Sequence, residues 1–254
     1  MMCKSVAEKQ HIHTGDIYDR MAPHYRAYAE QKSTYIEAVD HRILNNLPLG
    51  AQTMLDVGAG DGVRGLALAK AAGITRLVLA EPSAEMVRLC HRNGATEVWE
   101  GTADDLPETH QPPFDVITCL WNVMGHIPNG PARVRALKKM KSLLAPSGKI
   151  FMDVNNRHNA HAYGTLTVLG RRVMDRMAPD EKKGDVSFLW KINGEEIPAN
   201  GHLFTPAEVR ELVKQAGLEL TQSLAIDYKS GASSTDLTKG QMFFIIEKND
   251  GKTR

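Results

Sequence analysis

The stretch that decides the fold is Asp56-Val57-Gly58-Ala59-Gly60-Asp61-Gly62, which joins a predicted strand to a predicted helix. Residues 53–57 form a short, mostly apolar run, whereas residues 61–72 carry apolar side chains at helical spacing. Glycines at such a turn let the backbone bend tightly and approach a ligand without a Cβ between them. A second acidic residue, Glu81, ends the next predicted strand, where its carboxylate can accept both hydroxyls of a ribose. The stretch therefore predicts a nucleoside-binding loop at the edge of a sheet.

Strands and helices alternate over about a hundred residues around this loop. The predicted strands, separated by helices, cover residues 53–57, 76–80, 97–100, 114–120 and 149–154. The run at 114–120 is nearly continuously apolar, which is typical of a strand buried on both faces. Alternating strands and helices form βαβ units with right-handed crossovers and a parallel sheet. We therefore expect an α/β fold with a doubly wound sheet.

The segments before and after this alternating region do not follow the same pattern. Residues 155–202 are polar and irregular, with one expected strand at 186–192, and we interpret them as an insertion over the sheet. Two further strands, at 218–228 and 241–247, are joined by a loop too short for a crossover helix, so an antiparallel pair is expected. Residues 1–49 are expected to form a helical cap. The whole chain, residues 1–254, is expected to be one domain.

Composition and charge exclude several classes of protein. The 254 residues are 42% hydrophobic and 24% charged, and 31 Lys+Arg against 30 Asp+Glu give a net charge of +1. This balance offers no broad electrostatic surface for nucleic acid. The three cysteines, Cys3, Cys90 and Cys119, share no CxxC spacing and are expected to be free thiols in a reducing compartment. With neither a signal-peptide pattern nor an apolar run of membrane-spanning length, we expect a cytoplasmic protein with no nucleic-acid or membrane partner.

The glycine loop also satisfies a competing pattern. Gly60-Asp61-Gly62-Val63-Arg64-Gly65 matches GxGxxG, the fingerprint of dinucleotide-binding proteins. In that fingerprint the first glycine directly follows the strand, whereas here Gly58 holds that place. An acidic residue at the strand end would also repel a pyrophosphate, but it suits a cationic ammonium group. A nicotinamide-dependent oxidoreductase and a purely structural glycine turn stay open as alternatives.

The same residues resemble the motifs of class I S-adenosylmethionine-dependent methyltransferases. Residues 56–62 are similar to the first motif of that family. The later motifs follow in order at 81–86, 101–107, 114–117 and 143–149, and in the C-terminal strand pair. The resemblance implies a Rossmann-like methyltransferase fold with a seven-stranded, mostly parallel sheet of order 3-2-1-4-5-7-6, in which strand 7 is antiparallel. It also implies S-adenosylmethionine as the methyl donor and S-adenosylhomocysteine as the product.

Carried over residue by residue, the resemblance implies a donor site. Asp56, Gly58 and Gly60 would line the methionine portion. Glu81 would bind the ribose, Met86 and Asp104 would meet the adenine, and Leu120 would lie under the sulfonium. Core packing is the alternative for Met86 and Leu120. The expected cofactor-binding residues are Tyr18, Tyr25, Asp56, Gly58, Gly60, Glu81, Pro82, Met86, Ala103, Asp104 and Leu120.

The segment after the fourth strand indicates the acceptor class. Residues 120–127, Leu-Trp-Asn-Val-Met-Gly-His-Ile, lack the Asn/Asp-Pro-Pro-aromatic motif of nucleic-acid amino methyltransferases. They resemble the corresponding stretch of small-molecule N-methyltransferases, among them the glycine, sarcosine and amino-sugar N-methyltransferases. Asn122 and His126 occupy that stretch's Asn and His positions, whereas Asn155 and Arg157 depart from the glycine enzyme. We expect a small amine as the acceptor, with reaction at an oxygen as the alternative.

His126 is the expected general base, because an imidazole can take up a proton near neutral pH. The alternative is a histidine with only a structural role. The expected catalytic residues are His126 and Asn122. The expected acceptor-binding residues are Trp121, Asn122, His126, Asn156, Arg157 and Tyr163, with Trp190 as a further wall and Arg171 and Arg172 as candidate clamps for an anion.

The insertion and the cap are expected to act together as a lid over the acceptor. No metal is expected, because His158 and His161 lack an acidic or cysteine partner at metal-ligand spacing. Self-association, a binding protein without catalytic activity, and a protein or tRNA substrate stay open as alternatives.

Overall fold

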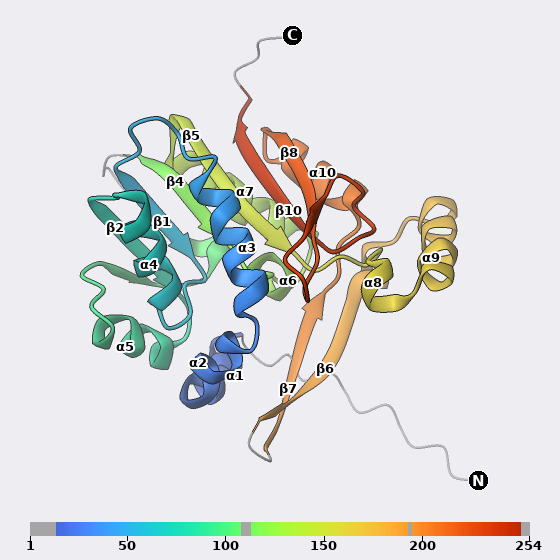
Figure 1. The fold of residues 1–254 in the computed structure, drawn as a ribbon, viewed down its shortest axis with the longest axis horizontal. Coiled ribbons are helices and arrows are strands. Elements are labelled where there is room, and N and C mark those ends of the chain that lie inside the picture. The colour runs from blue at the N-terminus through green and yellow to red at the C-terminus, as the bar shows by residue number, and fades with distance from the viewer. Residues whose placement is uncertain (1–13, 108–112, 193–194, 250–254) are drawn as a thin grey trace.

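The computed structural model of this chain describes residues 14–107, 113–192 and 195–249. Its central element is an eight-stranded sheet of order β3-β2-β1-β4-β5-β10-β8-β9 (Figure 1). The strands are β1 (Thr53–Val57), β2 (Arg76–Glu81), β3 (Val98–Glu100), β4 (Phe114–Cys119), β5 (Leu144–Val154), β8 (Leu218–Ile226), β9 (Ser233–Ser234) and β10 (Gln241–Lys248). Strands β1 to β5 pair in parallel, and β10 pairs antiparallel with β5 and β8. The expected mostly parallel sheet is confirmed, and β9 is the one strand that the expected order lacks.

Helices cover both faces of this sheet. They include α3 (Ser33–Leu44), α4 (Val63–Ala72), α5 (Ala84–Arg92), α7 (Gly130–Leu143) and α10 (Pro206–Gln215). Successive strand residues point to opposite faces, so Leu55 packs in the core under α7 and α10, while Met54 packs under α3 and α4. The sheet is therefore buried on both sides, as the apolar strand sequences predict.

The helices begin and end where the sequence places their signals. Thr205 caps α10, its side chain accepting from the backbone of Glu208, whose carboxylate completes a capping box. Gly73 takes a left-handed conformation at the end of α4. These local signals explain why the coarse order of elements follows from the sequence.

The N-terminal segment is helical from residue 14. It contains α1 (Thr14–Met21), a 3₁₀ turn (Ala22–His24) and α2 (Tyr25–Glu30), which lead into α3. Ile17 and Met21 of α1 are buried in one cluster with Met86 of α5 and with residues of the insertion. Residues 1–13 of the expected cap, including Cys3, lie outside the described residues.

The insertion after β5 contains more regular structure than the sequence predicts. It forms α8 (Ala160–Tyr163), α9 (Thr165–Met177), a 3₁₀ turn (Glu181–Gly184) and a hairpin of β6 (Asp185–Ile192) and β7 (Glu195–His202). Strand β6 matches the expected strand, whereas β7 was not expected, because Pro198 interrupts its strand pattern. The hairpin projects from the sheet past α1, and α9 stands at the outer edge beyond β8 and β10 (Figure 1).

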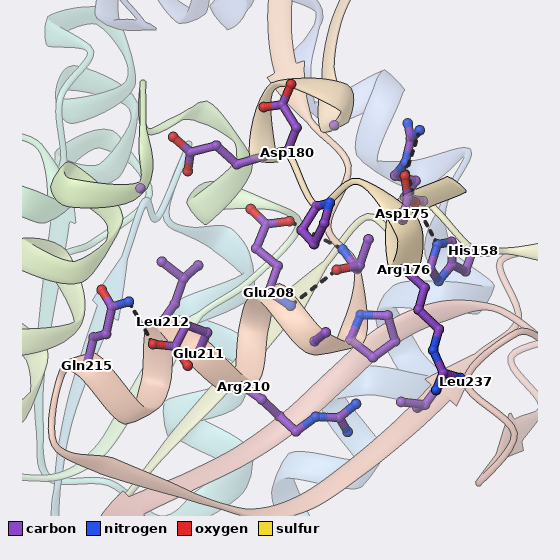
Figure 2. A pocket seen from close by; sticks show the side chains of 18 of the residues that line it. His158, Asp175, Arg176, Asp180, Glu208, Arg210, Glu211, Leu212, Gln215 and Leu237 are labelled. Atoms are coloured by element: carbon purple, nitrogen blue, oxygen red, sulfur yellow. Dashed lines mark hydrogen bonds and ion pairs between the residues drawn. The ribbon is translucent and has the colours of Figure 1, made fainter. Parts of the chain in front are cut away.

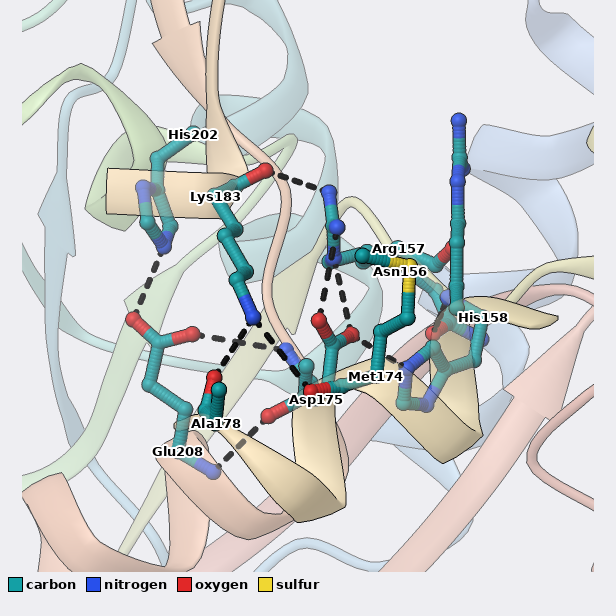
Figure 3. Close-up of polar contacts among 11 residues, drawn as sticks. Asn156, Arg157, His158, Met174, Asp175, Ala178, Lys183, His202 and Glu208 are labelled. Atoms are coloured by element: carbon teal, nitrogen blue, oxygen red, sulfur yellow. Dashed lines mark hydrogen bonds and ion pairs between the residues drawn. The ribbon is translucent and has the colours of Figure 1, made fainter. Parts of the chain in front are cut away.

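A buried histidine holds the base of this hairpin. His202 is 1% exposed, and its Nδ1 and Nε2 atoms lie 2.8 Å from Asp185 Oδ1 and 2.8 Å from Glu208 Oε1. Glu208 also lies 3.6 Å from the buried guanidinium of Arg133 (Figure 3 shows the contact between His202 and Glu208). The hairpin, α7 and α10 are thus joined through one network of charged groups.

We expect His202→Ala to lower the free energy of unfolding by roughly 3 kcal/mol, because it removes one member of a buried charged network and leaves Glu208 short of a partner. Urea unfolding measures this loss. His161→Ala is the matched control, since the His161 ring is half exposed and pairs with Asp227 at 2.7 Å. Equal small losses in the two variants would contradict the role assigned to His202.

Candidate functional site

The glycine loop lies at the carboxyl end of β1, where both conformation and space require glycine. Gly58 and Gly60 have φ angles of +72° and +58°. A Cβ at Gly58 would overlap the side chain of Val123, and a Cβ at Gly60 would overlap the ring of Tyr25. The loop thus forms a cradle that a side chain would fill.

Two buried carboxyl groups flank this cradle. Asp56 and Glu81 are 6% and 3% exposed, respectively. Asp56 Oδ1 accepts a hydrogen bond from Thr118 Oγ1 at 2.6 Å, and the two Glu81 oxygens accept from the Gly60 and Ser83 amides at 2.9 and 3.0 Å. Burial raises the pKa of Asp56 to about 6 and the pKa of Glu81 to about 7. Both groups favour a ligand that brings positive charge or hydroxyl donors.

Aromatic side chains from three separate segments meet beside the cradle. They are Tyr18, Tyr25 and Tyr28 of the N-terminal helices, Trp121 after β4, and Phe188 and Trp190 of β6. Tyr28 stacks on Trp121 with ring centroids 5.6 Å apart, and Tyr18 packs edge-on against Trp190 at 5.7 Å. We call these six residues the aromatic cluster.

His126 is the basic group at this cluster. It ends the short helix α6 (Val123–His126), with its Nδ1 3.2 Å from the Asn200 carbonyl oxygen and its Nε2 3.2 Å from the Tyr18 hydroxyl. A carbonyl only accepts, so Nδ1 carries the proton and Nε2 accepts from Tyr18. Burial lowers the pKa of His126 to about 4. At neutral pH the ring is therefore an uncharged base with its lone pair on Nε2.

The turn after β4 is strained and firmly held. Trp121 and Asn122 both have left-handed backbones, with φ angles of +60° and +64°, which side chains other than glycine seldom adopt. The Asn122 amide donates to Asp153 Oδ1 at 3.0 Å, and its side-chain oxygen accepts from the Asn155 amide at 2.9 Å. Trp121 Nε1 donates to the Tyr228 hydroxyl at 2.9 Å. Such strain is common at functional sites, and here it aims Trp121 at the tyrosines.

Asp153 and two arginines at this site were not expected. Asp153 is 1% exposed, and burial raises its pKa. The only feature of the sequence that points to Asp153 is that an acidic residue stands within an apolar strand. Arg26 makes a two-pronged ion pair with Asp61 of the glycine loop, and it directly follows the predicted Tyr25. Arg64 donates to Asp40 of α3 at 2.6 and 2.8 Å. The first pair connects α2 to the glycine loop, and the second connects α3 to α4.

A small cavity lies between these elements. Its volume is about 170 Å³, and its walls combine predicted donor-site residues with the N-terminal helices. The lining includes Asp56, Gly58, Leu120, Trp121, Tyr25, Arg26 and Arg64. Leu120 is 5% exposed and lies at the cavity wall, and its place under the sulfonium stays a prediction.

The residues expected around an adenine are packed or paired. Met86 is fully buried against α1, and Ala103 lies in the core under α7. Asp104 accepts from Thr102 at 3.0 Å and from Arg135 at 2.9 Å. Pro82 lies beside α1: a Cβ added at Gly15 of that helix would come within 3.1 Å of the Pro82 carbonyl oxygen.

Three expected acceptor-binding residues contact other parts of the molecule. The Asn156 side-chain nitrogen donates to the carbonyls of Leu237 and Gly240 at 2.6 and 2.8 Å. Arg157 donates to Asp175 of α9, and Tyr163 lies under the guanidinium of Arg171 at 4.4 Å. The structure therefore does not bring Asn156, Arg157 or Tyr163 to His126.

Arg157 instead lines a groove of about 1,380 Å³ between α7, α9 and α10 (Figure 2). Its walls carry both signs of charge, including His158, Asp175 and Arg176 on one side and Glu208 on the other (Figure 2). No residue of the glycine loop lines this groove.

The described residues contain neither a metal-ligand set nor a helix of membrane-spanning length. In the described residues no three His, Cys, Asp or Glu side chains form a metal-ligand set, and His158 and His161 are paired with Asp175 and Asp227. Within the same described segments, no helix is long and apolar enough to cross a membrane. Cys90 and Cys119 are buried free thiols.

A family model and sequence relatives both show that this chain is similar to methyltransferases. A family model described as a methyltransferase domain matches residues 25–223. The ubiquinone biosynthesis O-methyltransferase of Neisseria meningitidis serogroup A is 31% identical over 71% of this chain and 69% of its own length. That of Thiobacillus denitrificans is 28% identical over 71% of this chain and 70% of its own.

Solved structures show the same fold. A S-adenosylmethionine-dependent methyltransferase from Thermotoga maritima, described as a possible histamine N-methyltransferase, is 18% identical, with a TM-score of 0.65 over 93% of this chain and 100% of its own. An amino pentose methyltransferase from Micromonospora echinaspora, bound to S-adenosylmethionine, is 16% identical, with a TM-score of 0.62 over 89% and 97%. The likeness of residues 120–127 to glycine and sarcosine N-methyltransferases stays a prediction.

Proposed function

We infer that this chain, which belongs to the family of methyltransferase domains and takes S-adenosylmethionine as its methyl donor, methylates a small-molecule acceptor at an amine nitrogen. The observation that carries proton removal from the acceptor is the uncharged imidazole of His126, whose Nε2 lies 3.2 Å from the Tyr18 hydroxyl inside the aromatic cluster. The choice of nitrogen rests on the resemblance of residues 120–127 to small-molecule N-methyltransferases. The family membership also decides between the two interpretations of the glycine loop, in favour of S-adenosylmethionine over a nicotinamide dinucleotide.

The residues around the glycine loop fit this donor. The space above Gly60 opens to a ligand once the Tyr25 ring moves, whereas the Val123 side chain packs on Gly58. The buried Asp56 and Glu81 supply carboxylates for an ammonium group and for ribose hydroxyls. When bound, the donor supplies a methyl group activated by a sulfonium. The cavity of about 170 Å³ is smaller than typical ligand sites of roughly 300–1,000 Å³. We therefore propose that α1 and α2, with Tyr18 and Tyr25, shift outward to admit the donor and then close on it.

The affinity for the donor product is expected to rise with pH. Glu81 must be ionised for both of its oxygens to accept ribose hydroxyls, and its raised pKa of about 7 keeps it partly protonated below neutrality. We expect the dissociation constant of S-adenosylhomocysteine to fall by up to about tenfold per pH unit between about pH 5 and pH 7 and then to level off. Calorimetric titration across this range measures the effect. An affinity that stays constant would contradict the assignment of Glu81 to the ribose.

At the acceptor, the chain has three tasks. The aromatic cluster excludes water and holds the acceptor in line with the donor. The nitrogen must reach the site as the neutral amine, because an ammonium has no lone pair with which to attack. As the bond between this nitrogen and the methyl carbon forms, the bond between the methyl carbon and the sulfur of the donor breaks. His126 Nε2, released from its hydrogen bond with Tyr18, then accepts the proton that the methylated nitrogen loses. Asn122 positions this arrangement, because its backbone and side chain fix the turn that precedes α6.

A hydroxyl oxygen is the second candidate acceptor atom. The relatives at 28–31% identity are named as O-methyltransferases of ubiquinone biosynthesis. Aromatic walls would also stack on the ring of a phenol, and His126 would take the phenolic proton in the same way.

Incubation with isotopically labelled donor and a panel of small acceptors tests the proposal. The panel pairs amines, including amino sugars, with phenols of similar size. Label on an amine nitrogen, located by mass spectrometry, is the expected result. Label on phenols alone would move the reaction to oxygen. A protein that binds S-adenosylhomocysteine tightly and labels no small molecule would contradict the proposal.

A further inference from the structure

A lysine lies beside the aromatic cluster. The Lys32 ammonium is placed over two rings, with its Nζ 5.7 Å from the ring centroid of Tyr28 and 5.5 Å from that of Tyr228. Tyr28 stacks on Trp121 with ring planes 23° apart, and Trp121 Nε1 donates to the Tyr228 hydroxyl. Both tyrosines under the ammonium therefore contact Trp121, the residue that directly follows Leu120 in the chain.

The positive charge of Lys32 is not neutralised by an acid. Among the described residues, no carboxylate forms an ion pair with the Lys32 ammonium. Two arginines that line the small cavity do have such partners: Arg26 pairs with Asp61. Arg64 pairs in the same way with Asp40. Lys32 is thus a cation next to the aromatic cluster that is available to an anionic group of a ligand.

The Tyr228 hydroxyl supplies a second donor. It accepts from Trp121 Nε1 at 2.9 Å, and within the described segments its own hydrogen has no acceptor. Burial raises the pKa of Tyr228 to about 12, so the hydroxyl keeps its proton. An ammonium over the ring and a hydroxyl at its edge together favour a carboxylate over an uncharged group.

Lys32 belongs to the fixed part of the N-terminal segment. Its carbonyl oxygen accepts from the Tyr35 amide of α3 at 3.1 Å. Tyr35 stacks on Tyr228 at 4.5 Å, and its hydroxyl donates to Asp153 of β5 at 3.1 Å. Figure 1 shows α3 lying along the sheet, whereas α1 and α2 project beyond its edge. An outward shift of α1 and α2 would therefore remove Tyr28 with α2 and leave Lys32 in place.

We propose that the acceptor is an aromatic amine that carries a carboxylate at the far end of its ring. The ring stacks on Trp121 in the place that Tyr28 takes in the structure. The nitrogen faces His126, and the carboxylate binds the Lys32 ammonium and the Tyr228 hydroxyl. This proposal rests on the proposed function and narrows the acceptor to one chemical class.

Calorimetric titration of the complex with S-adenosylhomocysteine tests the proposal with two matched probes. The probes are para-(aminomethyl)benzoate and benzylamine, which differ only in the carboxylate. We expect para-(aminomethyl)benzoate to bind at least roughly tenfold more tightly, because hydrogen bonds between charged groups are the stronger kind. Equal binding of the two probes, or no binding of either, would overturn the proposal.

Variants assign the preference for the carboxylate to particular side chains. Lys32→Gln removes the charge, so it should bring the two affinities to within about twofold of each other, whereas Lys32→Arg should keep most of the difference. Tyr228→Phe removes one donor and should reduce the difference by roughly threefold or more. Lys70→Gln is the matched control, because Lys70 is an exposed lysine in the last turn of α4.

Thermal unfolding first checks that each variant is folded. Lys32→Gln loses only contacts between a cation and two rings, so we expect a melting temperature close to that of the parent. A preference for the carboxylate that survives Lys32→Gln, or that Lys70→Gln reduces equally, would overturn the proposal.

Incubation with labelled donor separates this proposal from the choice of nitrogen. Equal kcat/KM for para-(aminomethyl)benzoate and benzylamine would keep the amine as the acceptor and overturn the carboxylate. A second matched pair is para-hydroxyphenylacetate and para-cresol, which again differ only in the carboxylate. Methylation of para-hydroxyphenylacetate in preference to para-cresol, with neither amine labelled, would move the reaction to oxygen and support the carboxylate.

Discussion

Glu81→Gln is expected to weaken the binding of S-adenosylhomocysteine by about a hundredfold, because hydrogen bonds to a charged acceptor contribute roughly 1.5–3 kcal/mol each. In the structure the two carboxylate oxygens accept from the Gly60 and Ser83 amides. A glutamine has one oxygen, so in either orientation its NH₂ group faces one of these amide donors. The variant therefore removes the charge and also disturbs the loop that cradles the donor.

Two measurements keep the role of Glu81 separate from a general loss of structure. Thermal unfolding of Glu81→Gln shows whether the fold survives. Glu85→Gln, the same chemical change on the exposed side of α5, is expected to bind S-adenosylhomocysteine as the parent does. A folded Glu81→Gln variant with unchanged affinity would remove Glu81 from the donor site.

His126→Gln is expected to lower kcat by roughly 100- to 1,000-fold with little change in the affinity for S-adenosylhomocysteine. An amide can keep the contact with Tyr18, but it lacks a basic ring nitrogen to accept the proton that the acceptor loses. Because burial lowers the pKa of His126 to about 4, the parent ring is neutral above about pH 5. Any fall in rate between pH 8 and pH 6 should therefore come from other groups, such as the acceptor and Glu81.

Single-turnover rates at saturating donor measure this effect without the donor-binding step. His161→Gln is the matched control, because His161 is half exposed and hydrogen-bonds to Asp227 instead of the aromatic cluster. If His126→Gln retained its rate within a few-fold, proton transfer to His126 would not be part of the reaction.

The sequence predicts the central sheet well because its signals are local. The apolar runs, the glycine loop and the capping box at Thr205 each occupy a few consecutive residues, and the antiparallel pair follows from one short loop. Strand β7 escapes prediction because Pro198 and two glutamates break its pattern. This segment is a strand because it pairs with β6, and its own sequence does not predict that pairing.

The candidate site is predictable only in part for the same reason. Asp56, Glu81 and His126 stand out in the sequence, but the contact between Tyr18 and His126 joins residues 108 positions apart. Asn200, which fixes the tautomer of His126, comes from the unpredicted strand β7. No periodicity in the sequence encodes such contacts.

The expectation for Asn156, Arg157 and Tyr163 rested on their position just after β5. Ligands bind at the carboxyl edge of such sheets, so residues there are natural candidates. The chain turns away at Asn156, because its side chain ties this segment to the loop before β10. Arg157 then serves to anchor α9.

A crystal structure of the protein with S-adenosylhomocysteine tests the central claim most directly. The account predicts that the ribose hydroxyls lie on Glu81, that the Tyr25 ring has left the space above Gly60, and that the sulfur faces the aromatic cluster on the side of His126. S-adenosylhomocysteine bound in the groove behind α9, with Tyr25 still packed on Gly60, would contradict it.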